Sequence, residues 1–324
     1  MKCGHSDRRC FPYEELSNRN FSAFSSMFPS QEDTLRAAAC VFSSNDGETI
    51  IEWLAYHFAI GFDTAIVIRG RSNDGTHALI DAVGASWDVR VFDWPFGYKE
   101  RRDDAYRIIC RELASQFDWV GFFDADEFVL PMWHDDVKEW LETLGDAEAV
   151  ALNWAMYGSS GFEEPPEGLI IENYLKRAPD DFRPNRHVKS IVRPAAVRDV
   201  LNPHYFRVDG PYVDAIGAPV AWSRPGLTDE APKFDTCRIN HYFTRSRADW
   251  AKIVEASDFD IRTWADFAIY DRNEITDDSI LRFSHSTRLE LMRIRHLRTD
   301  ILSSYLSGAT RDNPWRSRLP EPRK

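Results

Sequence analysis

The segment WVGFFDADEFVL, residues 119–130, brings two carboxylates, Asp124 and Asp126, to the end of an apolar strand. Open parallel sheets bind ligands at the carboxyl ends of their strands. Successive strand residues point to opposite faces, so both acids are expected on one side, where they could share a divalent cation or arrange a water. The alternative is a turn after a buried strand, where Asp is common. A third acid, Glu127, and the return to apolar residues at Phe128 favour a functional site.

Composition limits the class of protein that could carry this site. The 324 residues can form one large α/β domain with an elaborated second half, or two small domains, and can bury a sizeable core. A formal net charge of −12 argues against a protein that holds nucleic acid by its phosphates, so no nucleic-acid partner is expected. The five cysteines are odd in number and scattered, which suits reduced thiols in a cytosolic protein.

Membrane signals are weak in this chain. No apolar run approaches the roughly 18 to 20 residues that a membrane-spanning helix needs, so no transmembrane segment is predicted. The N-terminus carries charges where a signal peptide would be apolar, and we therefore expect a cytoplasmic protein. The basic tail beyond Asn313 could contact an anionic membrane surface, although a solvated tail has the same composition.

Strand and helix patterns alternate through the first half of the chain. Apolar and β-branched runs predict strands before Asp124 and at 38–44, 64–68, 89–94 and 149–154. Helices are predicted between them, beginning after Asn45, after the SNDGT turn at 72–76, at about 99 and at about 135. This order predicts an α/β protein with a mostly parallel sheet flanked by helices.

Composition divides the chain into four parts. Residues 1–35 mix Ser, Asn, Pro and charges without a period and form an irregular lead-in. The alternating pattern occupies 36–156, and Pro- and Gly-rich connections with short strands fill 157–245. Helical patterns dominate the remainder, 246–324, so we expect a helical C-terminal region and tail.

Between about residues 38 and 255 the chain resembles bacterial family 2 type glycosyltransferases, close to the group known as glycosyl transferase family 92 or DUF23-like. The resemblance rests on seven segments that occur in order: EWLAYHFAIGFD, SNDGT, FFDADEF, WAMYGSSGF, HVKSIVRP, NPHYF and INHYFTRS. It implies a GT-A (Rossmann-like) fold, in which 36–156 is the nucleotide-sugar-binding half and 157–245 is the half that binds the acceptor and completes the metal site.

The same resemblance implies that Asp124 and Asp126 are a DxD pair, which holds Mn²⁺ or Mg²⁺ against the diphosphate of a nucleotide sugar. A hard cation held by carboxylates would stabilise the charge of the leaving diphosphate. A histidine from the second half completes the metal shell in many such enzymes. His241 is the favoured candidate and His204 the other, while a structural histidine in a polar core is an equally open interpretation of either.

Contacts to the donor are expected from Asn45, Asp74, Asp124 and Lys189, where a UDP-sugar is the most common donor of such enzymes. The turn after the second strand departs from the family pattern, because the chain has IRGRSNDGT where related sequences have a motif like YDNDSTDGT. Residues 69–71, two arginines and a glycine, stand where that motif has Asp, Asn and Asp, and the first of those Asp residues commonly reads the base. The arginines could meet a phosphate or be solvated, so the identity of the nucleotide stays open.

A carboxylate is needed to take the acceptor's proton if the transfer inverts the sugar. Asp214 lies at a plausible distance after the acid pair, and Glu164, with its neighbour Glu163, follows the GSSG segment. The acceptor itself is expected to be a glycan, a lipid-linked sugar or a small molecule.

Two other functions are compatible with the acid motif. A haloacid-dehalogenase-like phosphatase also has a DxD strand, but it usually has Thr or Val at the position of Phe128 and places the motif on an early strand. A non-catalytic sugar-binding module of GT-A fold would account for the altered turn at 69–71. The intact acid pair favours the metal-dependent glycosyltransferase.

Overall fold

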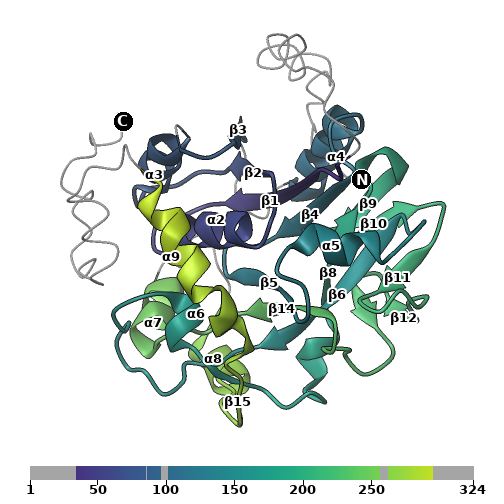
Figure 1. Ribbon diagram of the computed structural model, residues 1–324. Helices are drawn as coiled ribbons and strands as arrows, with labels where there is room; N and C mark the ends of the chain where they lie inside the picture. The colour runs from purple at the N-terminus through teal and green to yellow at the C-terminus, as the bar shows by residue number, and fades with distance from the viewer. Residues whose placement is uncertain (1–33, 85, 96–100, 256–261, 295–324) are drawn as a thin grey trace, which may run out of the picture. The chain divides into compact units, whose positions relative to one another are not determined.

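The computed structural model describes residues 34–84, 86–95, 101–255 and 262–294, and within them nine strands form one sheet with helices around it (Figure 1). In the order in which they lie, the strands are β3 (Val89–Asp93), β2 (Thr64–Arg69), β1 (Ala37–Ser43), β4 (Trp119–Phe123), β8 (Val188–Val192), β6 (Ala149–Met156), β14 (Cys237–His241) and β5 (Glu127–Pro131), with β11 (Tyr212–Asp214) also paired to β6.

Most neighbouring strands are parallel. The strand β1 runs parallel to β2 and β4, β2 to β3, and β6 to β14 and β11. Two strands run in the opposite direction. Strand β8 is antiparallel to β4 and β6, and β5 is antiparallel to β14. The predicted α/β class, with a mostly parallel sheet flanked by helices, is confirmed.

The two faces of the sheet have separate cores, as the alternation along β1 shows. Ala37, Ala39 and Val41 belong to one core, which is covered by α2 (Ile50–Ala59), α3 (Thr76–Val83) and α5 (Val137–Glu142). The intervening residues of β1 belong to the other core, under α4 (Arg102–Leu113) and the hairpin of β9 (Val197–Asn202) and β10 (Tyr205–Val208). The sheet is therefore buried on both faces.

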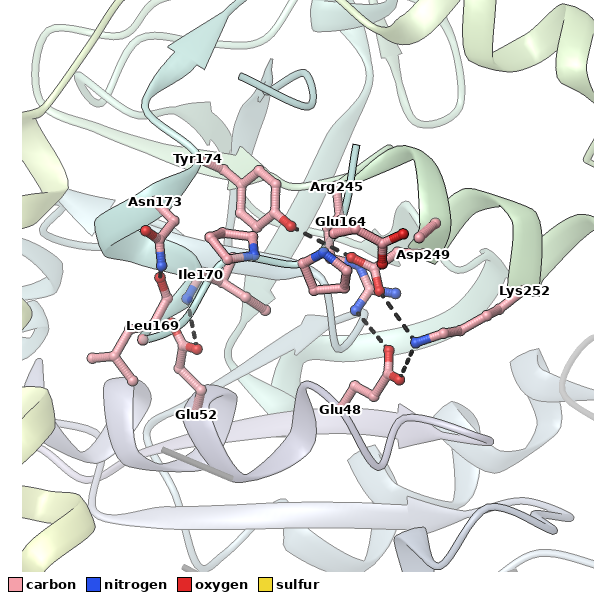
Figure 2. Close-up of a pocket in the computed structure, with 14 residues that line it drawn as sticks. Glu48, Glu52, Glu164, Leu169, Ile170, Asn173, Tyr174, Arg245, Asp249 and Lys252 are labelled. Atoms are coloured by element: carbon pink, nitrogen blue, oxygen red, sulfur yellow. Dashed lines mark hydrogen bonds and ion pairs between the residues drawn. The ribbon is translucent and has the colours of Figure 1, made fainter. Parts of the chain in front are cut away.

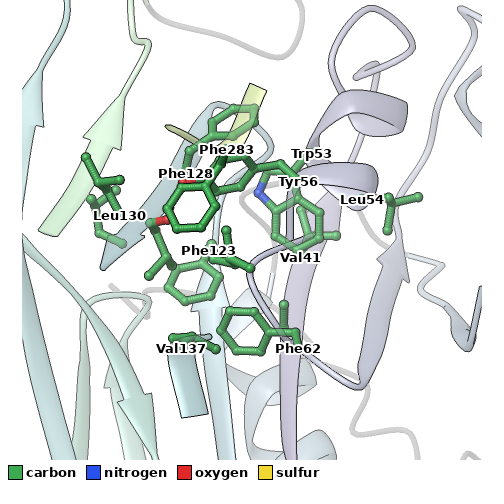
Figure 3. Packing of buried hydrophobic residues seen from close by; sticks show 14 of the residues in the cluster. Val41, Trp53, Leu54, Tyr56, Phe62, Phe123, Phe128, Leu130, Val137 and Phe283 are labelled. Carbon is green, nitrogen blue, oxygen red and sulfur yellow. The ribbon is translucent and has the colours of Figure 1, made fainter. Parts of the chain in front are cut away.

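Helix α2 fixes the strand that follows the acids. Trp53 donates its indole N–H to the Glu127 carbonyl over 2.9 Å, and Tyr56 donates its hydroxyl to the Val129 carbonyl over 2.7 Å. The rings of both residues pack near Phe128 in the core (Figure 3). Each buried aromatic side chain contributes roughly 1.5–3 kcal/mol by leaving water, so α2 holds β5 by packing as well as by hydrogen bonds.

Shorter elements complete the second half. They are α6 (Ile170–Asn173), β7 (Lys176–Arg177), the 3₁₀ turns η1 (Arg183–Arg186), η2 (Pro194–Ala196) and η3 (Ser279–Phe283), the hairpin β12 (Trp222–Arg224) and β13 (Leu227–Thr228), α7 (Arg247–Glu255), α8 (Trp264–Tyr270), β15 (Ile275–Thr276) and α9 (Ser284–Met292). Helix α9 returns to α2, where Phe283 at its start meets the ring of Tyr56 edge-on at 5.9 Å.

One expectation about the acid segment is wrong. The sequence suggested one strand that carries both acids on one side, whereas β4 ends at Phe123 and β5 begins at Glu127, so the acids lie in a three-residue turn. The strand order separates β4 from β5 by β8, β6 and β14, and the sheet must therefore curl until the end of β4 meets the start of β5.

Some predictions concern residues that the structure does not describe. The irregular lead-in, all but its last two residues, and the basic tail beyond Asn313 lie outside them. Cys40, Cys110 and Cys237 are buried free thiols. In the described part of the chain, no helix has the length and apolar character to span a bilayer. The cytoplasmic location stays a prediction.

A buried network of ion pairs joins Arg238 on β14 to Asp277 and Arg177. Asp277 accepts a hydrogen bond from Arg238 on β14 at 2.8 Å and one from Arg177 on β7 at 2.7 Å. Burial alone would raise the pKa of Asp277, but Arg238 and Arg177 outweigh it and lower the pKa to about 2. All three side chains are less than a tenth exposed.

We predict that Asp277→Asn lowers the stability at pH 7 by about 2 kcal/mol, since a carboxylate whose pKa is depressed in the native state stabilises it above the unfolded pKa. This contribution should disappear as the pH falls from about 4 to about 2, so the two proteins should converge there. Urea unfolding at several pH values checks this. The control is Asp209→Asn, which breaks an exposed ion pair with Arg198. We expect this change to lower the stability by less than about 1 kcal/mol at every pH.

Candidate active site

Glu127 stabilises the acidic turn through two hydrogen bonds with Asp124. The Glu127 amide donates to the Asp124 carbonyl at 3.0 Å, and the Asp124 amide donates to the Glu127 carboxylate at 2.8 Å. The Tyr242 amide, just after β14, donates to the Asp126 carbonyl at 2.9 Å. These bonds fix the backbone on both sides of the acids, so the side chains project from a rigid frame.

Two cations hold Asp124. Arg102, at the start of α4, donates to one carboxylate oxygen at 2.9 Å, and Lys189 on β8 donates to the other at 2.8 Å. Burial alone would raise the pKa of Asp124, but the charges of Lys189 and Arg102 outweigh it and hold the pKa well below its usual range. Asp124 is therefore an anion already neutralised by the protein.

Lys189 is shared with Glu127. Its ammonium lies 3.2 Å from a Glu127 carboxylate oxygen, and both side chains are fully buried. Burial raises the pKa of Glu127 to about 7, although the charge of Lys189 opposes the rise. Lys189, expected to meet a donor phosphate, is thus enclosed between two carboxylates of its own chain, which leaves it no access to a ligand.

Asp126 faces His241 rather than a lysine. The two are 3.5 Å apart, from a carboxylate oxygen to Nε2, and Asp126 is the more exposed partner at 25%. Burial lowers the pKa of His241, but Asp126, together with Glu127 and Asp124, outweighs burial, and the net pKa is raised. On the other side of the ring, Nδ1 lies 3.9 Å from Glu127, directly across the strand pair.

His204 contacts β8 and Trp154 and forms no ion pair with the acids among the described residues. Its Nδ1 is 2.9 Å from the Val188 carbonyl, and its ring packs edge-on against Trp154 with centroids 5.3 Å apart. Burial, with help from Lys189, lowers its pKa to about 3, so it is neutral. Trp154 also packs edge-on against the His241 ring, with centroids 4.5 Å apart. His241 is the histidine that reaches the acid turn, because its Nε2 lies 3.5 Å from Asp126.

The loops after β1 and β2 meet beside the acids. Asp74 accepts from the Gly47 amide at 2.9 Å, and the exposed Asn45, at a φ of 59°, accepts from the Asn73 amide at 2.8 Å. The expected donor contacts Asn45 and Asp74 therefore tie these loops to each other. Between them, Asp46 has a pKa raised to about 7, mainly by burial.

The altered turn at 69–71 has a structural explanation. Arg69 is bound to Asp93 at 2.6 Å and to Asp81 at 2.7 Å, which engages its guanidinium outside the acid site. A side chain at Gly70 would come within 2.8 Å of the Phe42 ring. Arg71 is exposed. Packing of the turn against β1 and α3 accounts for Arg69 and Gly70 without a phosphate.

The two candidate bases lie in different places. Asp214 accepts from the amides of Ile216 and Ala218 and pairs with Lys233 at 2.5 Å, which makes it the organiser of a turn. It is aligned with Ala151 on β6, five residues or roughly 16 Å along the strand from the residue that pairs with His241. Glu164 is exposed and lines a pocket.

Sequence reasoning missed Arg102 and the structural part played by Glu127. Arg102 belongs to a run of charges, KERRDD, whose spacing does not single out one member. Glu127 was noticed only as a third acid. Within the part of the chain described, no cluster of three or more His, Cys, Asp and Glu could hold a metal ion, so Asp126 and His241 form at most a two-residue set.

Comparison with known proteins gives partial matches. No family model matches the chain. A glycosyltransferase family 92 protein of Ricinus communis is 28% identical over 167 residues, which cover 50% of this chain and 29% of that protein. One of Oryza sativa subsp. japonica is 26% identical over 176 residues, covering 52% and 28%. The chain thus spans about three tenths of the length of these relatives.

Among solved structures, S. aureus TarS (1–349) aligns over 50% of this chain and 48% of its own, with 16% identity and a TM-score of 0.31. The curated relatives do not test the family 2 part of the predicted resemblance. In sequence, the chain is similar to glycosyltransferase family 92 proteins, which confirms the resemblance that its motifs predicted.

Proposed function

We propose that the chain is a glycosyltransferase that moves a sugar from a nucleotide-sugar donor to a hydroxyl of a glycan, lipid-linked or small acceptor. The observation that carries this proposal is the fixed turn at the carboxyl end of β4, where Asp126 faces His241 while Asp124 is neutralised by the protein. The similarity to family 92 proteins supports the reaction class. A UDP-sugar is the proposed donor.

Asp126 and His241 fit a divalent cation. Their facing atoms are 3.5 Å apart, close enough for one ion to contact both with a small adjustment. Mg²⁺ and similar hard ions are commonly held by one or two protein ligands, with waters and substrate phosphates completing the shell. The buried His241 Nδ1 and one Glu127 oxygen have no hydrogen-bond partner and face each other, an arrangement that turns Nε2 toward Asp126.

We therefore propose Asp126 and His241 as the residues that would hold Mn²⁺ or Mg²⁺. The ion would supply positive charge to the diphosphate as it leaves. Asp124, expected as a second ligand, has both oxygens on Arg102 and Lys189. In this proposal Asp124 holds Arg102 beside the site, and Asp126 is the carboxylate of the turn that would bind the ion.

The base that takes the acceptor proton stays a prediction. Glu164, at a pocket, is better placed than Asp214, whose oxygens bind a turn and Lys233. A phosphatase that used Asp124 as its nucleophile would first have to break two ion pairs. We therefore retain the transferase as the single proposal.

We predict that UDP with Mn²⁺ raises the Tm of the protein more than either alone, because a ligand that binds only the native state stabilises it. Asp126→Asn should remove this added shift and abolish transfer, with little loss of stability without ligand, since Asp126 is the less buried acid. His241→Ala should weaken Mn²⁺ binding several-fold.

Asp81→Asn, an exposed acid that pairs with Arg69, is the matched control and should behave as the wild type. An unchanged Mn²⁺-dependent shift in Asp126→Asn, or transfer that EDTA does not diminish, would contradict the metal assignment. Sugar binding without any turnover of UDP-, GDP-, CMP- or dTDP-sugars would indicate a non-catalytic module.

The charge arrangement predicts a second effect. Lys189→Met should destabilise the fold by about 3–5 kcal/mol, because it leaves Asp124 and Glu127 buried without their shared cation. Adding Glu127→Gln should recover part of this loss. Lys138→Met, which breaks a partly exposed pair with Asp63, should cost at most about 1 kcal/mol. Denaturant unfolding of the four proteins measures the difference, and equal losses for Lys189→Met and Lys138→Met would refute the arrangement.

A further inference from the structure

A pocket of about 400 Å³ lies among α2, the segment 164–174 and the start of α7 (Figure 2). Its walls come from the loop before α2 and α2 itself, from the segment 164–174, and from the segment 245–252. This volume is within the range of roughly 300–1,000 Å³ that is usual for small-molecule sites. Nothing in the proposed metal and diphosphate site uses this space.

Two residues of the pocket wall lie close in the chain to residues of the acid site. Arg245 on its wall follows His241 by four residues, and the charge of Asp126 is among those that act on Arg245. Glu48 on the facing wall follows Asp46 by two residues, and the charge of Asp126 also acts on Asp46. The charge of Asp126 therefore reaches Arg245 on one wall and Asp46 close to the other.

One side of the pocket carries a chain of alternating charges. Lys252 binds Glu48 at 2.6 Å and lies 3.6 Å from Asp249, which accepts a long hydrogen bond from the Tyr174 hydroxyl at 3.4 Å. Figure 2 shows Arg245 between Asp249 and Glu48. Hydrogen-bond donors and acceptors thus alternate along this wall.

Arg245 is the least satisfied group of this wall. Its side chain is 16% exposed, its nearest ion-pair contact, with Glu48, is 3.9 Å long, and it makes no hydrogen bond to the described residues. A guanidinium has five N–H donors, and leaving them unpaired in a mostly buried place is costly. Arg245 also has a φ of 52°, a conformation that non-glycine residues adopt mainly where the surroundings impose it.

The opposite side is less polar. It is formed by the ring of Tyr174, two prolines and the aliphatic residues Leu169 and Ile170. Glu52, also on the wall, is satisfied by the amides of Ile170 and Ile171, at 2.8 and 3.0 Å. The pocket therefore offers an apolar surface on one side and a mixed set of donors and acceptors on the other.

This chemistry selects among ligand classes. Four carboxylates and two cations line the pocket, so an anionic ligand would meet more repulsion than attraction. An apolar ligand would leave the charged wall unpaired. A neutral ring with many hydroxyls satisfies both sides, because each hydroxyl donates to a carboxylate or accepts from Arg245 and Lys252, while its C–H face packs on the apolar side.

We propose that this pocket binds a neutral, hydroxyl-rich acceptor, namely the sugar ring that receives the transferred unit. The assignment rests on the proposed glycosyltransferase function, which it deepens by naming the acceptor class. Arg245 and Glu48 are the specificity-determining residues, since they face each other across the pocket wall at 3.9 Å as its donor and its acceptor.

Glycan binding without donor tests the pocket separately from the reaction. The protein is titrated with a panel of neutral and sulfated oligosaccharides by saturation-transfer NMR, and UDP with Mn²⁺ is followed by thermal shift. We expect binding of neutral members only, and about tenfold weaker binding in Glu48→Gln and Arg245→Met, the loss of about one charge-assisted hydrogen bond. The UDP and Mn²⁺ shift should persist in Glu48→Gln.

Glu142→Gln, an exposed acid at the end of α5, is the matched control and should bind glycans as the wild type does. Because Arg245 is mostly buried, its variant counts only if its unfolding transition matches the wild type, and Glu48→Gln carries the test otherwise. Glycan binding unchanged in Glu48→Gln, or a preference for sulfated members, overturns the pocket assignment.

The two proposals fail separately. A normal UDP and Mn²⁺ shift with glycan binding that ignores the pocket variants refutes the pocket and leaves the transferase. Glycan binding that the variants weaken, with no nucleotide shift or transfer in the wild type, refutes the transferase and leaves a sugar site.

Discussion

A single buried ammonium determines how the acid turn is built. Lys189 lies between Asp124 and Glu127 with no exposed surface, so these two carboxylates can lie close together around one shared cation. The pairing also divides the acids into two kinds. Asp124 and Glu127 share Lys189, whereas Asp126, the most exposed of the three, pairs with His241.

The position of Lys189 follows from the topology. It lies on β8, which runs antiparallel between β4 and β6, so its side chain enters from a strand that is distant in sequence from the acids. The curl that joins β4 to β5 in three residues brings Glu127 opposite His241 on β14. Helix α2, through Trp53 and Tyr56, then holds β5 in that register.

The same frame accounts for the pocket. Glu52 of α2 binds the amides of Ile170 and Ile171, so the helix that supports the acid turn also holds the 164–174 wall. The other wall continues directly from β14. A donor site and an acceptor site built on one helix and one strand would keep a fixed separation, which is what a transfer between two bound molecules requires.

The sequence by itself determined the α/β alternation, the positions of most strands, and the location of an acid cluster where a strand ends. These features are local, since they depend on side-chain period and on turn residues that neighbours in the chain supply. It also favoured His241 over His204, and His241 is the one that lies 3.5 Å from Asp126. It did not separate the functions of the three acids.

Only the tertiary structure decided that Asp124 is paired with Lys189 and Arg102, that Asp214 organises a turn, and that Arg69 serves its own loop. The reason is that the role of a charged side chain depends on which charged or polar group it contacts. The partners of Asp124 and Arg69 lie 12 to 65 residues away in the chain. Asp214 instead depends on a local turn that composition does not reveal. The antiparallel position of β8 and the curl of the sheet bring Lys189 to Asp124. Both features arise from long-range strand pairing, which the local side-chain period does not encode.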